Sequence, residues 1–451
     1  MTQALIDKFL VLNEIGPDLG GNQSREVGRV FIDTLACIHA GWDEPVGQRL
    51  REVHPDVPLP LSDGTRNAPQ KNSGAADPEA AALVLGTAAH ALDFDDVHTT
   101  SVNHPSAVIV PAIEALVASG GGPRERAAGA YVVGLAVNIA LGEALGFDHY
   151  QRGWHATSTI GPLSSAAACA YLMSADENAF RAAISIAAAQ AGGMQRNFGT
   201  MAKPLQAGLA ASAGVRAARL AVAGVTAAPD GLGTINGDGY LGLYRGKKPG
   251  KRIEDIEIDG DAGSLSRKLY GCCYQAHRPI AAALNARRLL DPKVLSGSKV
   301  RVEVLVPYGT TGPLRVKRPT TGLEGKFSGQ YAVATALLDG EVTLAAFEDD
   351  AVRREAAQSL LRRVELIEDK VTDDLPIGIN HGTVRLTVKQ NGQPIARTEV
   401  AHFPGSPENP FTEAELEGKV RDCLAHASRN GRGGPSVAAF MTGALQSAGL
   451  A

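Results

Sequence analysis

Residues 209–224 read LAASAGVRAARLAVAG, a stretch of alanine, glycine and aliphatic residues that contains only two arginines. Alanine and leucine are strong helix formers, so the stretch predicts most of a helix over residues 204–223. Its many small side chains allow neighbouring helix axes to approach closely. The stretch therefore predicts a helix in the interior of a tightly packed helical body.

The same composition extends over residues 78–225 and predicts several further helices. Asp77 precedes Pro78 and Glu79, which places a capping carboxylate before a first-turn proline and predicts a helix from Pro78 toward Leu92. Other helices are predicted at 105–119, 126–145, 162–173 and 177–192. Residues 55–76 are rich in proline, aspartate, asparagine and glycine, and this composition is typical of a loop.

After residue 265 the pattern changes to short runs with period two. Residues 299–306 (KVRVEVLV) alternate, and 383–388 (TVRLTV) alternate again before an Asn391-Gly392 turn and a second strand pattern. An Asn-Gly pair between alternating runs is a specific hairpin signal. The sequence thus predicts a mainly α protein with a large helical domain, 1–265 completed by 402–451, and a smaller α+β domain, 266–401.

Composition and charge exclude several classes of protein. The 451 residues include 44 Lys and Arg against 48 Asp and Glu, giving a net charge of −4 without a long basic block. This charge pattern offers no footprint for nucleic acid or an anionic membrane. We expect no apolar run long enough for a membrane span, and five scattered cysteines favour a reducing, cytoplasmic setting.

Four polar clusters carry the candidate chemistry. They are residues 90–98 (HALDFDDVH) with 103–106 (NHPS), 153–162 (GWHATSTIGP), 197–204 (NFGTMAKP) and 267–278 (RKLYGCCYQAHR). The second and third directly precede predicted helices, whose N-terminal N–H groups favour a carboxylate or phosphate. The fourth concentrates cations, a phenol and an imidazole, which suits an anion.

Alternatives to anion chemistry have weaker sequence support. His98 and His104 with the nearby acids could form a metal site, but no H-E-x-x-H or similar spacing accompanies them. Cys273 beside His277 could be a nucleophile, although a buried structural thiol is the simpler interpretation. Residues 231–240 (GLGTINGDGY) lack a dinucleotide fingerprint, and we expect no metal and no organic cofactor.

The ordered motifs resemble those of the MmgE/PrpD family. The resemblance covers residues 10–420 and rests on ALDFDDVH with NHPSAVIVPA, then GWHATSTIG, FGTMAKPLQAGLAASAGVRAA, KLYGCCYQAH and KFSGQYAVATALLDGEV. Members include 2-methylcitrate dehydratase, cis-aconitate decarboxylase and iminodisuccinate epimerase. The resemblance implies a helical domain, an α+β lid domain, a homodimer and a small di- or tricarboxylate substrate.

These activities share one step, in which a carbanion beside a carboxylate is made or protonated. Such a step needs an acid or base near the carbon and cations that hold the carboxylates. The family's polar active-site positions correspond to five residues here: Asp93, His104, His155, Lys203 and Lys268. Thr157, Tyr270 and His277 are expected to contact substrate.

By this resemblance His104 is the leading acid or base, and Lys203 and Lys268 are carboxylate clamps or proton donors. His155 is expected to position or protonate substrate, and Asp93 to orient a neighbouring histidine or lysine. We expect a dehydratase-type lyase, with an epimerase, a decarboxylase and a non-catalytic carboxylate-binding scaffold as alternatives. Val97 stands where the family often has threonine, and Cys273 where cis-aconitate decarboxylase has histidine.

Overall fold

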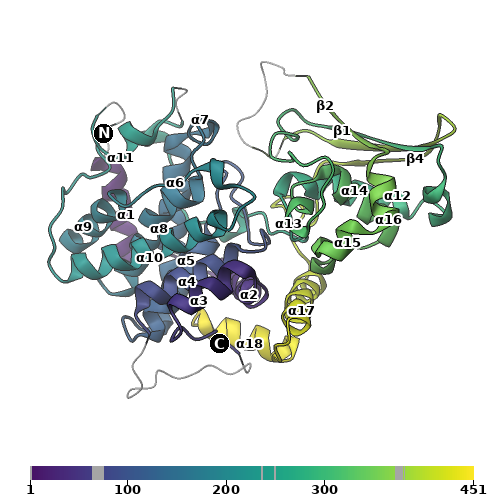
Figure 1. Ribbon diagram of the computed structural model, residues 1–451. Helices are drawn as coiled ribbons and strands as arrows, with labels where there is room; N and C mark the ends of the chain where they lie inside the picture. Colours follow the sequence, from purple (N-terminus) through teal and green to yellow (C-terminus); the bar gives the residue numbers. More distant parts are fainter. Residues whose placement is uncertain are drawn as a thin grey trace. The chain divides into compact units, whose positions relative to one another are not determined.

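The computed structural model describes residues 3–62, 76–234, 237–247, 250–370, 379 and 381–450. The chain forms two compact units, residues 1–265 with 416–451 and residues 266–415 (Figure 1). Most of the loop predicted at 55–76, residues 63–75, lies outside the described residues, as do two residues of the stretch 231–240. The predicted class, mainly α with a smaller α+β part, is confirmed.

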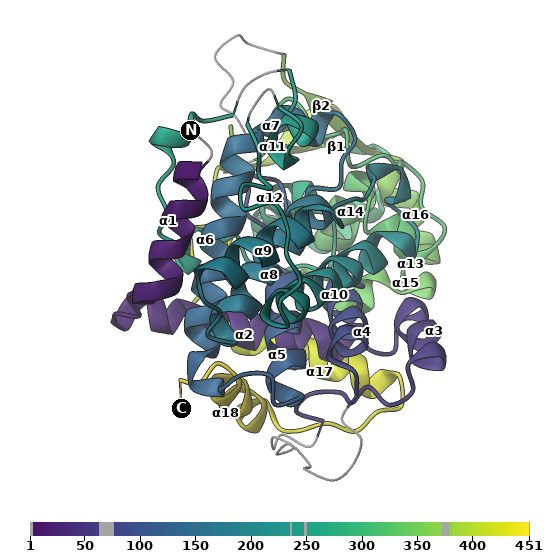
Figure 2. The same cartoon turned by 90° about the vertical axis from the view of Figure 1, so that its left-hand side faces the viewer.

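Among its described residues the first unit has helices joined by loops and no β-strand, and Figure 2 shows these helices. Its longer helices are α1 (Gln3–Ile15), α2 (Gly21–Gly41), α3 (Pro45–Val53), α4 (Pro78–His90), α5 (Ser106–Ala118), α6 (Ala127–Leu145), α8 (Ala156–Leu172), α9 (Glu177–Ala188), α10 (Ala202–Val222), α17 (Glu413–Arg429, from residue 416) and α18 (Val437–Ser447). Short helical segments are α7 (Phe147–Gln151), α11 (Tyr240–Tyr244), η1 (Arg124–Arg126), η2 (Gln195–Asn197), η3 (Ile253–Asp255) and η4 (Ala262–Ser264).

Helices α4 and α10 pack against each other through small residues, as the sequence predicts. A Cβ on Gly208 of α10 would lie 2.2 Å from the backbone oxygen of Leu83 in α4, and one on Gly86 would lie 3.0 Å from the Cα of Gly208. Only glycine allows this approach. The close contact fixes the end of α4, at His90, relative to the start of α10, near Lys203.

Helix α8 begins earlier than the sequence indicates. It starts at Ala156 rather than near residue 162, and Pro162 lies inside it. Proline removes one helical N–H and leaves the carbonyl four residues earlier without its usual donor. The N–H of Gly192 lies 3.5 Å from that carbonyl, on Ser158. The extra turn places Thr157 in the first turn of the helix and makes His155 its N-cap residue.

One expectation about apolar length was wrong. The segment Arg124–Leu145, which contains α6, is long and apolar enough to cross a membrane. Of its apolar window, 89% is buried inside the protein. Packing against α8, α5 and α1 in the centre of the helical unit accounts for this composition.

The second unit is a four-stranded sheet with helices packed against it. Strands β1 (Val300–Val306), β2 (Val364–Glu368), β3 (Val384–Gln390) and β4 (Gln393–Val400) lie in the order β2-β1-β3-β4. Strands β1 and β2 are parallel, and the other neighbours are antiparallel. The predicted Asn391-Gly392 hairpin is confirmed, because both residues have positive φ as a tight primed turn requires.

The helices of this unit are α12 (His277–Arg287), α13 (Gly322–Gly325), α14 (Gly329–Asp339), α15 (Asp349–Arg353) and α16 (Glu355–Leu361), with η5 (Tyr274–Ala276), η6 (Pro292–Ser296) and η7 (Leu344–Phe347). Helices α12 and α14 contact the sheet. The extended backbone at Arg354 separates α15 from α16.

Residues 402–415 belong to the second unit, whereas the sequence assigned them to the first. The ring of Phe403 packs against Tyr274 and His277, with ring centroids 5.2 and 5.0 Å away. The N–H of Arg267 donates to the carbonyl of Gly405 at 2.7 Å. These contacts attach the segment to the loop before α12.

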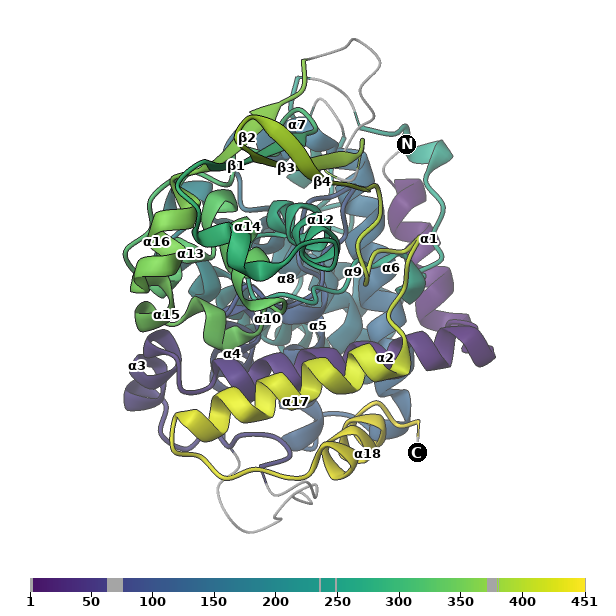
Figure 3. The same cartoon turned by 90° about the vertical axis from the view of Figure 1, so that its right-hand side faces the viewer.

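Helix α17, from the C-terminal part of the chain, packs into the first unit. It lies alongside α2, as Figure 3 shows, and Nζ of Lys419 is 2.6 Å from Oδ1 of Asp33 on α2. Both side chains are almost completely buried. The same ammonium donates to the carbonyl of Phe94 at 2.7 Å. The C-terminal segment therefore supports the loop that carries the acidic residues 93–96.

Candidate active site

The candidate site lies in the first unit, where one helix ends and three others begin. His90 is the last residue of α4, and His104 lies two residues before α5. His155 is the N-cap residue of α8, and Lys203 lies in the first turn of α10. Helix N-termini carry partial positive charge and unpaired N–H groups, so this arrangement favours an anion.

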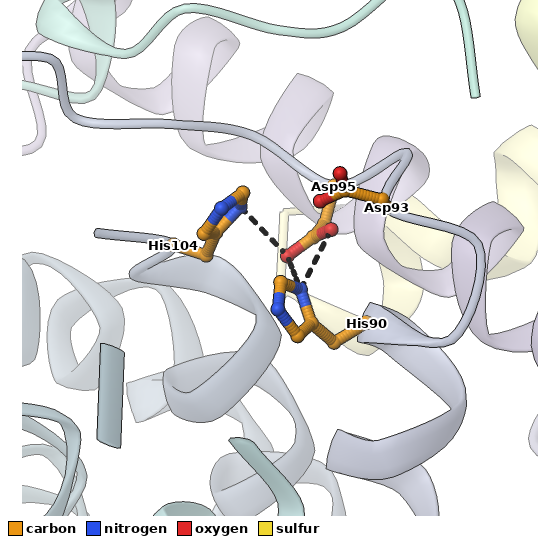
Figure 4. A group of neighbouring side chains, drawn as sticks. All are labelled: His90, Asp93, Asp95 and His104. Carbon is orange, nitrogen blue, oxygen red and sulfur yellow. Dashed lines mark hydrogen bonds and ion pairs between the residues drawn. The ribbon is translucent and has the colours of Figure 1, made fainter. Parts of the chain in front are cut away.

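The carboxylate of Asp95 joins two histidines at the centre of the site (Figure 4). Nδ1 of His90 lies 3.0 and 2.8 Å from the two carboxylate oxygens, and Nδ1 of His104 lies 3.2 Å from Oδ2. The two rings meet edge to face with centroids 4.5 Å apart. Asp95 is fully buried, whereas the His104 side chain keeps 14% of its surface exposed. His104 is thus the more accessible histidine of the pair.

The pKa of Asp95 is well below its usual value. Burial alone would raise that pKa, but the charges of His90 and His104 and their hydrogen bonds outweigh it. Asp95 is therefore a carboxylate at neutral pH, and it orients both imidazoles. A carboxylate that orients histidine is a common support for proton transfer.

A second charged pair lies beside this cluster. Nζ of Lys203 donates to Oδ1 of Asp93 at 2.7 Å, and it lies 5.3 Å from the centre of the Phe198 ring. Asp93 has a φ of +54°, in the left-handed region that aspartate tolerates better than most residues. This turn directs the chain back after α4 and brings the carboxylate to the start of α10.

The third acid of the loop, Asp96, has a different role. Its Oδ1 accepts the N–H of Ser106 at 3.3 Å, and its Oδ2 accepts the Ser106 hydroxyl. A carboxylate is favourable at the first turn of α5, where the macrodipole is positive. Each acid of the sequence DFDD therefore has its own partner, which explains why three carboxylates are tolerated after the end of a helix.

His155 faces the cluster from the other side. Its ring stacks on His90 with centroids 5.8 Å apart and meets Phe198 edge to face at 5.1 Å. Burial, followed by the charges of His90, Lys203 and His104, lowers the pKa of His155 well below its usual value, against an opposing contribution from Asp93. The ring is neutral at physiological pH.

Thr157 holds the backbone of the leading acid or base. Its hydroxyl oxygen accepts the N–H of His104 at 3.1 Å, and its side chain is buried. Four of the predicted catalytic residues (Asp93, His104, His155 and Lys203) therefore lie together with Thr157 in one unit.

The other predicted residues lie in the second unit, in the loop before α12. Lys268 and His277 are completely buried, and Tyr270 is nearly so. Nε2 of His277 accepts the N–H of Tyr270 at 3.4 Å, and Nδ1 faces the carbonyl of Cys273 at 3.4 Å. Burial raises the pKa of Tyr270. This geometry favours a positioning role for His277 in shaping the loop.

Four ligand-type residues lie close enough together to hold a cation. One atom each of His90, Asp93, Asp95 and His104 falls within a group no wider than 4.8 Å. Asp95 already pairs with His90 and His104, and the Lys203 ammonium pairs with Asp93. A fixed positive charge against a ligand oxygen disfavours a divalent ion. His98, the other histidine of the motif, contacts Ser101 at 2.6 Å and lies outside this group.

Three participants were missed as site residues from the sequence: His90, Asp95 and Gln206. His90 and Asp95 stand inside the motif ALDFDD and its preceding turn, so their signal was present in the polar cluster itself. Gln206 follows Lys203 by three residues, the spacing that places two side chains on one helix face. It is an amide on a helix that consists mainly of small and apolar residues, and that contrast could have identified it.

Comparison with known proteins identifies the family. The MmgE/PrpD N-terminal domain matches residues 18–249, and the MmgE/PrpD C-terminal domain matches residues 270–432. The chain belongs to the MmgE/PrpD family, as its motifs indicated.

Its relatives include enzymes with an assigned reaction. The human cis-aconitate decarboxylase is 28% identical over 361 residues, 78% of this chain and 73% of that protein. The cis-aconitate decarboxylase of Aspergillus terreus is 27% identical over 420 residues, 87% of this chain and 83% of that protein. A cis-aconitate decarboxylase-like protein of Aspergillus oryzae is 25% identical over 437 residues, 91% and 88% of the two chains.

Proposed function

We propose that this protein is a cofactor-independent lyase that makes or protonates a carbanion beside a carboxylate of a small di- or tricarboxylate. The observation that carries the proposal is the carboxylate of Asp95 shared by His90 and His104, with the Lys203–Asp93 pair and His155 beside it. This arrangement supplies proton-transfer groups and a cation within one small, buried region.

The roles follow from exposure and charge. His104 is the proposed acid or base, because it is the exposed member of the pair on Asp95. The Lys203 ammonium is the proposed partner of a substrate carboxylate, and Asp93 holds that ammonium in place. His155, neutral and buried, is proposed to donate a hydrogen bond to an oxygen of the substrate.

Decarboxylation is the reaction to test first, because the relatives named above are cis-aconitate decarboxylases or resemble one. In that reaction the bond to one carboxylate carbon breaks and CO₂ leaves. The electron pair stays on the organic fragment, and a proton from His104 is transferred to the carbanion. The site needs only an acid and a cation for this step.

Dehydration is the alternative, favoured by the sequence departure at Cys273 from the histidine of the decarboxylase. There a base removes a proton from carbon, an acid protonates the hydroxyl group on the neighbouring carbon, and that group leaves as water while the C–H electron pair forms the double bond. The pair His90 and His104 provides one imidazole for each transfer. An epimerase would use the same pair to remove and return one proton.

In the second unit, Lys268 is proposed as a further carboxylate-binding residue and Tyr270 as a substrate contact. These two roles are tested by measuring the Michaelis constant of variants for a carboxylate substrate. Lys268→Met and Tyr270→Phe are expected to raise KM for a carboxylate substrate. An unchanged KM in both variants would assign this loop a structural role.

We also propose a cytoplasmic homodimer. Leu209 and Leu220 lie three turns apart on one face of α10 and are 51% and 39% exposed, so that this face offers apolar surface to a second copy of the chain. Light scattering is expected to give twice the chain mass. A monomer at micromolar concentration would contradict the proposal.

Product analysis tests the reaction. The purified protein is incubated separately with cis-aconitate, citrate, 2-methylcitrate, malate, tartrate and iminodisuccinate, and each mixture is followed by proton NMR with CO₂ detection. Decarboxylation predicts CO₂ and a product with one carboxylate fewer. New vinyl signals without CO₂ would identify a dehydratase, and stereoisomer interconversion an epimerase. No change across the panel would contradict the proposal for these substrates.

A further inference from the structure

We infer that Gln206 is a positioning residue that holds His155 in the tautomer with its proton on Nε2, so that His155 presents an N–H donor to the substrate. The catalytic consequence rests on the proposed function. The tautomer itself is a property of the protein and can be measured without any substrate.

The orientation of the Gln206 amide is fixed by a backbone N–H, which can only donate. Its Oε1 accepts the backbone N–H of Met194 at 2.8 Å and the side-chain Nδ2 of Asn197 at 3.1 Å. A backbone N–H has no acceptor capacity, so the oxygen of the amide must face Met194. The amide nitrogen therefore lies on the side of His155.

The amide nitrogen determines the protonation of the imidazole. Nε2 of Gln206 lies 2.8 Å from Nδ1 of His155 and donates to it. A ring nitrogen that accepts a hydrogen bond carries no proton, so a neutral His155 must carry its proton on Nε2. The backbone N–H of His155 donates to the carbonyl of Gly193 at 3.1 Å, which attaches the backbone of His155 to the loop that contains Met194.

The surroundings of His155 keep the ring neutral. The groups that face it are His90 from α4, His104 before α5, Lys203 from α10 and Asp93 from the loop after α4. Burial and the three basic groups disfavour a further proton, and Asp93 opposes them only in part. Donation from Gln206 to Nδ1 adds to this effect.

The proton on Nε2 points to a ligand. Nε2 of His155 is buried and has no hydrogen-bond partner among the residues described here. An unpaired buried donor is unfavourable, and an oxygen of a substrate carboxylate or enolate would satisfy it. His90 has the opposite arrangement, because its Nδ1 faces Asp95 and its Nε2 has no partner within the described chain.

The test uses the substitution Gln206→Glu, which keeps the shape and the acceptor for Met194 but replaces the donor with a carboxylate. A carboxylate can only accept, so the proton of His155 is expected to move to Nδ1. The readout is nitrogen-15 NMR of protein labelled at histidine, with the His155 signals assigned by their loss in His155→Gln. Wild type is expected to show a protonated Nε2 and an unprotonated Nδ1 from pH 6 to pH 9.

The control is Gln190→Glu, the same substitution at a residue whose amide contacts Ile186 and Arg216. It is expected to change neither the His155 signals nor turnover. With a substrate identified, Gln206→Glu is expected to lower kcat/KM on the order of 100-fold, the loss typical of one donor to a developing oxyanion.

A protonated Nδ1 in wild type, or an unchanged tautomer in a folded Gln206→Glu variant, would overturn the inference. If that variant does not fold, the wild-type spectrum alone decides. The expected tautomer together with no turnover of any carboxylate would leave the inference standing and count against the proposed function.

Discussion

Nζ of Lys203 lies 2.7 Å from Oδ1 of Asp93, and the two side chains are only 9% and 8% exposed. Removing one member of a buried pair leaves the other charge without compensation, which costs about 3–5 kcal/mol. Lys203→Met is therefore expected to lower the free energy of unfolding by that amount and to abolish turnover. Adding Asp93→Asn is expected to restore much of the stability but none of the turnover.

Denaturant unfolding and steady-state kinetics of both variants measure these effects. Lys251→Met is the control, because Lys251 pairs with Glu143 at the surface and is 54% exposed. Exposed pairs contribute less than about 1 kcal/mol. Turnover by the Lys203→Met variant at the wild-type rate would remove Lys203 from the reaction.

Lys419 supports the acidic loop from the C-terminal helix. Its ammonium contacts Asp33 and the carbonyl of Phe94, and its side chain is fully buried. Lys419→Met is expected to cost about 3–5 kcal/mol and to reduce activity, although Lys419 is not proposed to contact substrate. The double variant Asp33→Leu with Lys419→Met is expected to regain stability without regaining full activity. Full activity in the stable double variant would argue against support of the loop.

The sequence predicted the fold and much of the site because the relevant signals are local. Helix starts follow from caps such as Asp77, which accepts the N–H of Ala80 at 3.2 Å, and the hairpin follows from Asn391-Gly392. The early start of α8 was missed because Pro162 favours a first-turn position, and only a tertiary contact from Gly192 compensates for it inside the helix.

Which site residues pair with one another could not be predicted from the sequence. Lys203 is 110 residues from Asp93, and Gln206 is 51 residues from His155. No local rule links such positions, because their proximity depends on how α4, α8 and α10 pack. The resemblance supplied the residues Asp93, His104, His155 and Lys203. It did not reveal that Asp95 lies between two histidines.

Buried neutral histidines make the protein sensitive to acid. Burial lowers the pKa of His39, and likewise of His98 and His149, to about 4. The unfolded chain binds these protons near pH 6.5 and the folded chain does not. Each neutral histidine therefore contributes fully to the free energy of unfolding above pH 6.5. This contribution is lost as the pH falls from 6.5 toward 4.

His39→Gln tests this dependence, since glutamine can still donate to the carbonyl of Pro60, which His39 contacts at 2.5 Å. Between pH 6.5 and pH 4 the variant is expected to take up one proton fewer on unfolding. The slope of its unfolding free energy against pH is therefore expected to be smaller by about 1.4 kcal/mol per pH unit. His402→Gln, at a half-exposed position, is the control. Equal slopes in His39→Gln and wild type would show that His39 is not held neutral.

Chelation is expected to leave activity unchanged. The four ligand-type residues of the site are paired with one another and with Lys203, so catalysis does not require a divalent ion in this account. Activity is measured after exhaustive dialysis against EDTA and metal-free buffer. A loss that Zn²⁺ or Mg²⁺ restores would replace the proton-transfer interpretation with a metal site.

The central claim is that His104, oriented by Asp95, transfers a proton to or from a carbon beside a carboxylate. It is tested most directly by following the reaction in D₂O by NMR, with wild type and His104→Asn side by side. The account predicts one deuterium at a single carbon of the wild-type product or recovered substrate, with one stereochemistry, and none with the variant. Turnover and deuterium incorporation by His104→Asn at the wild-type rate would contradict it.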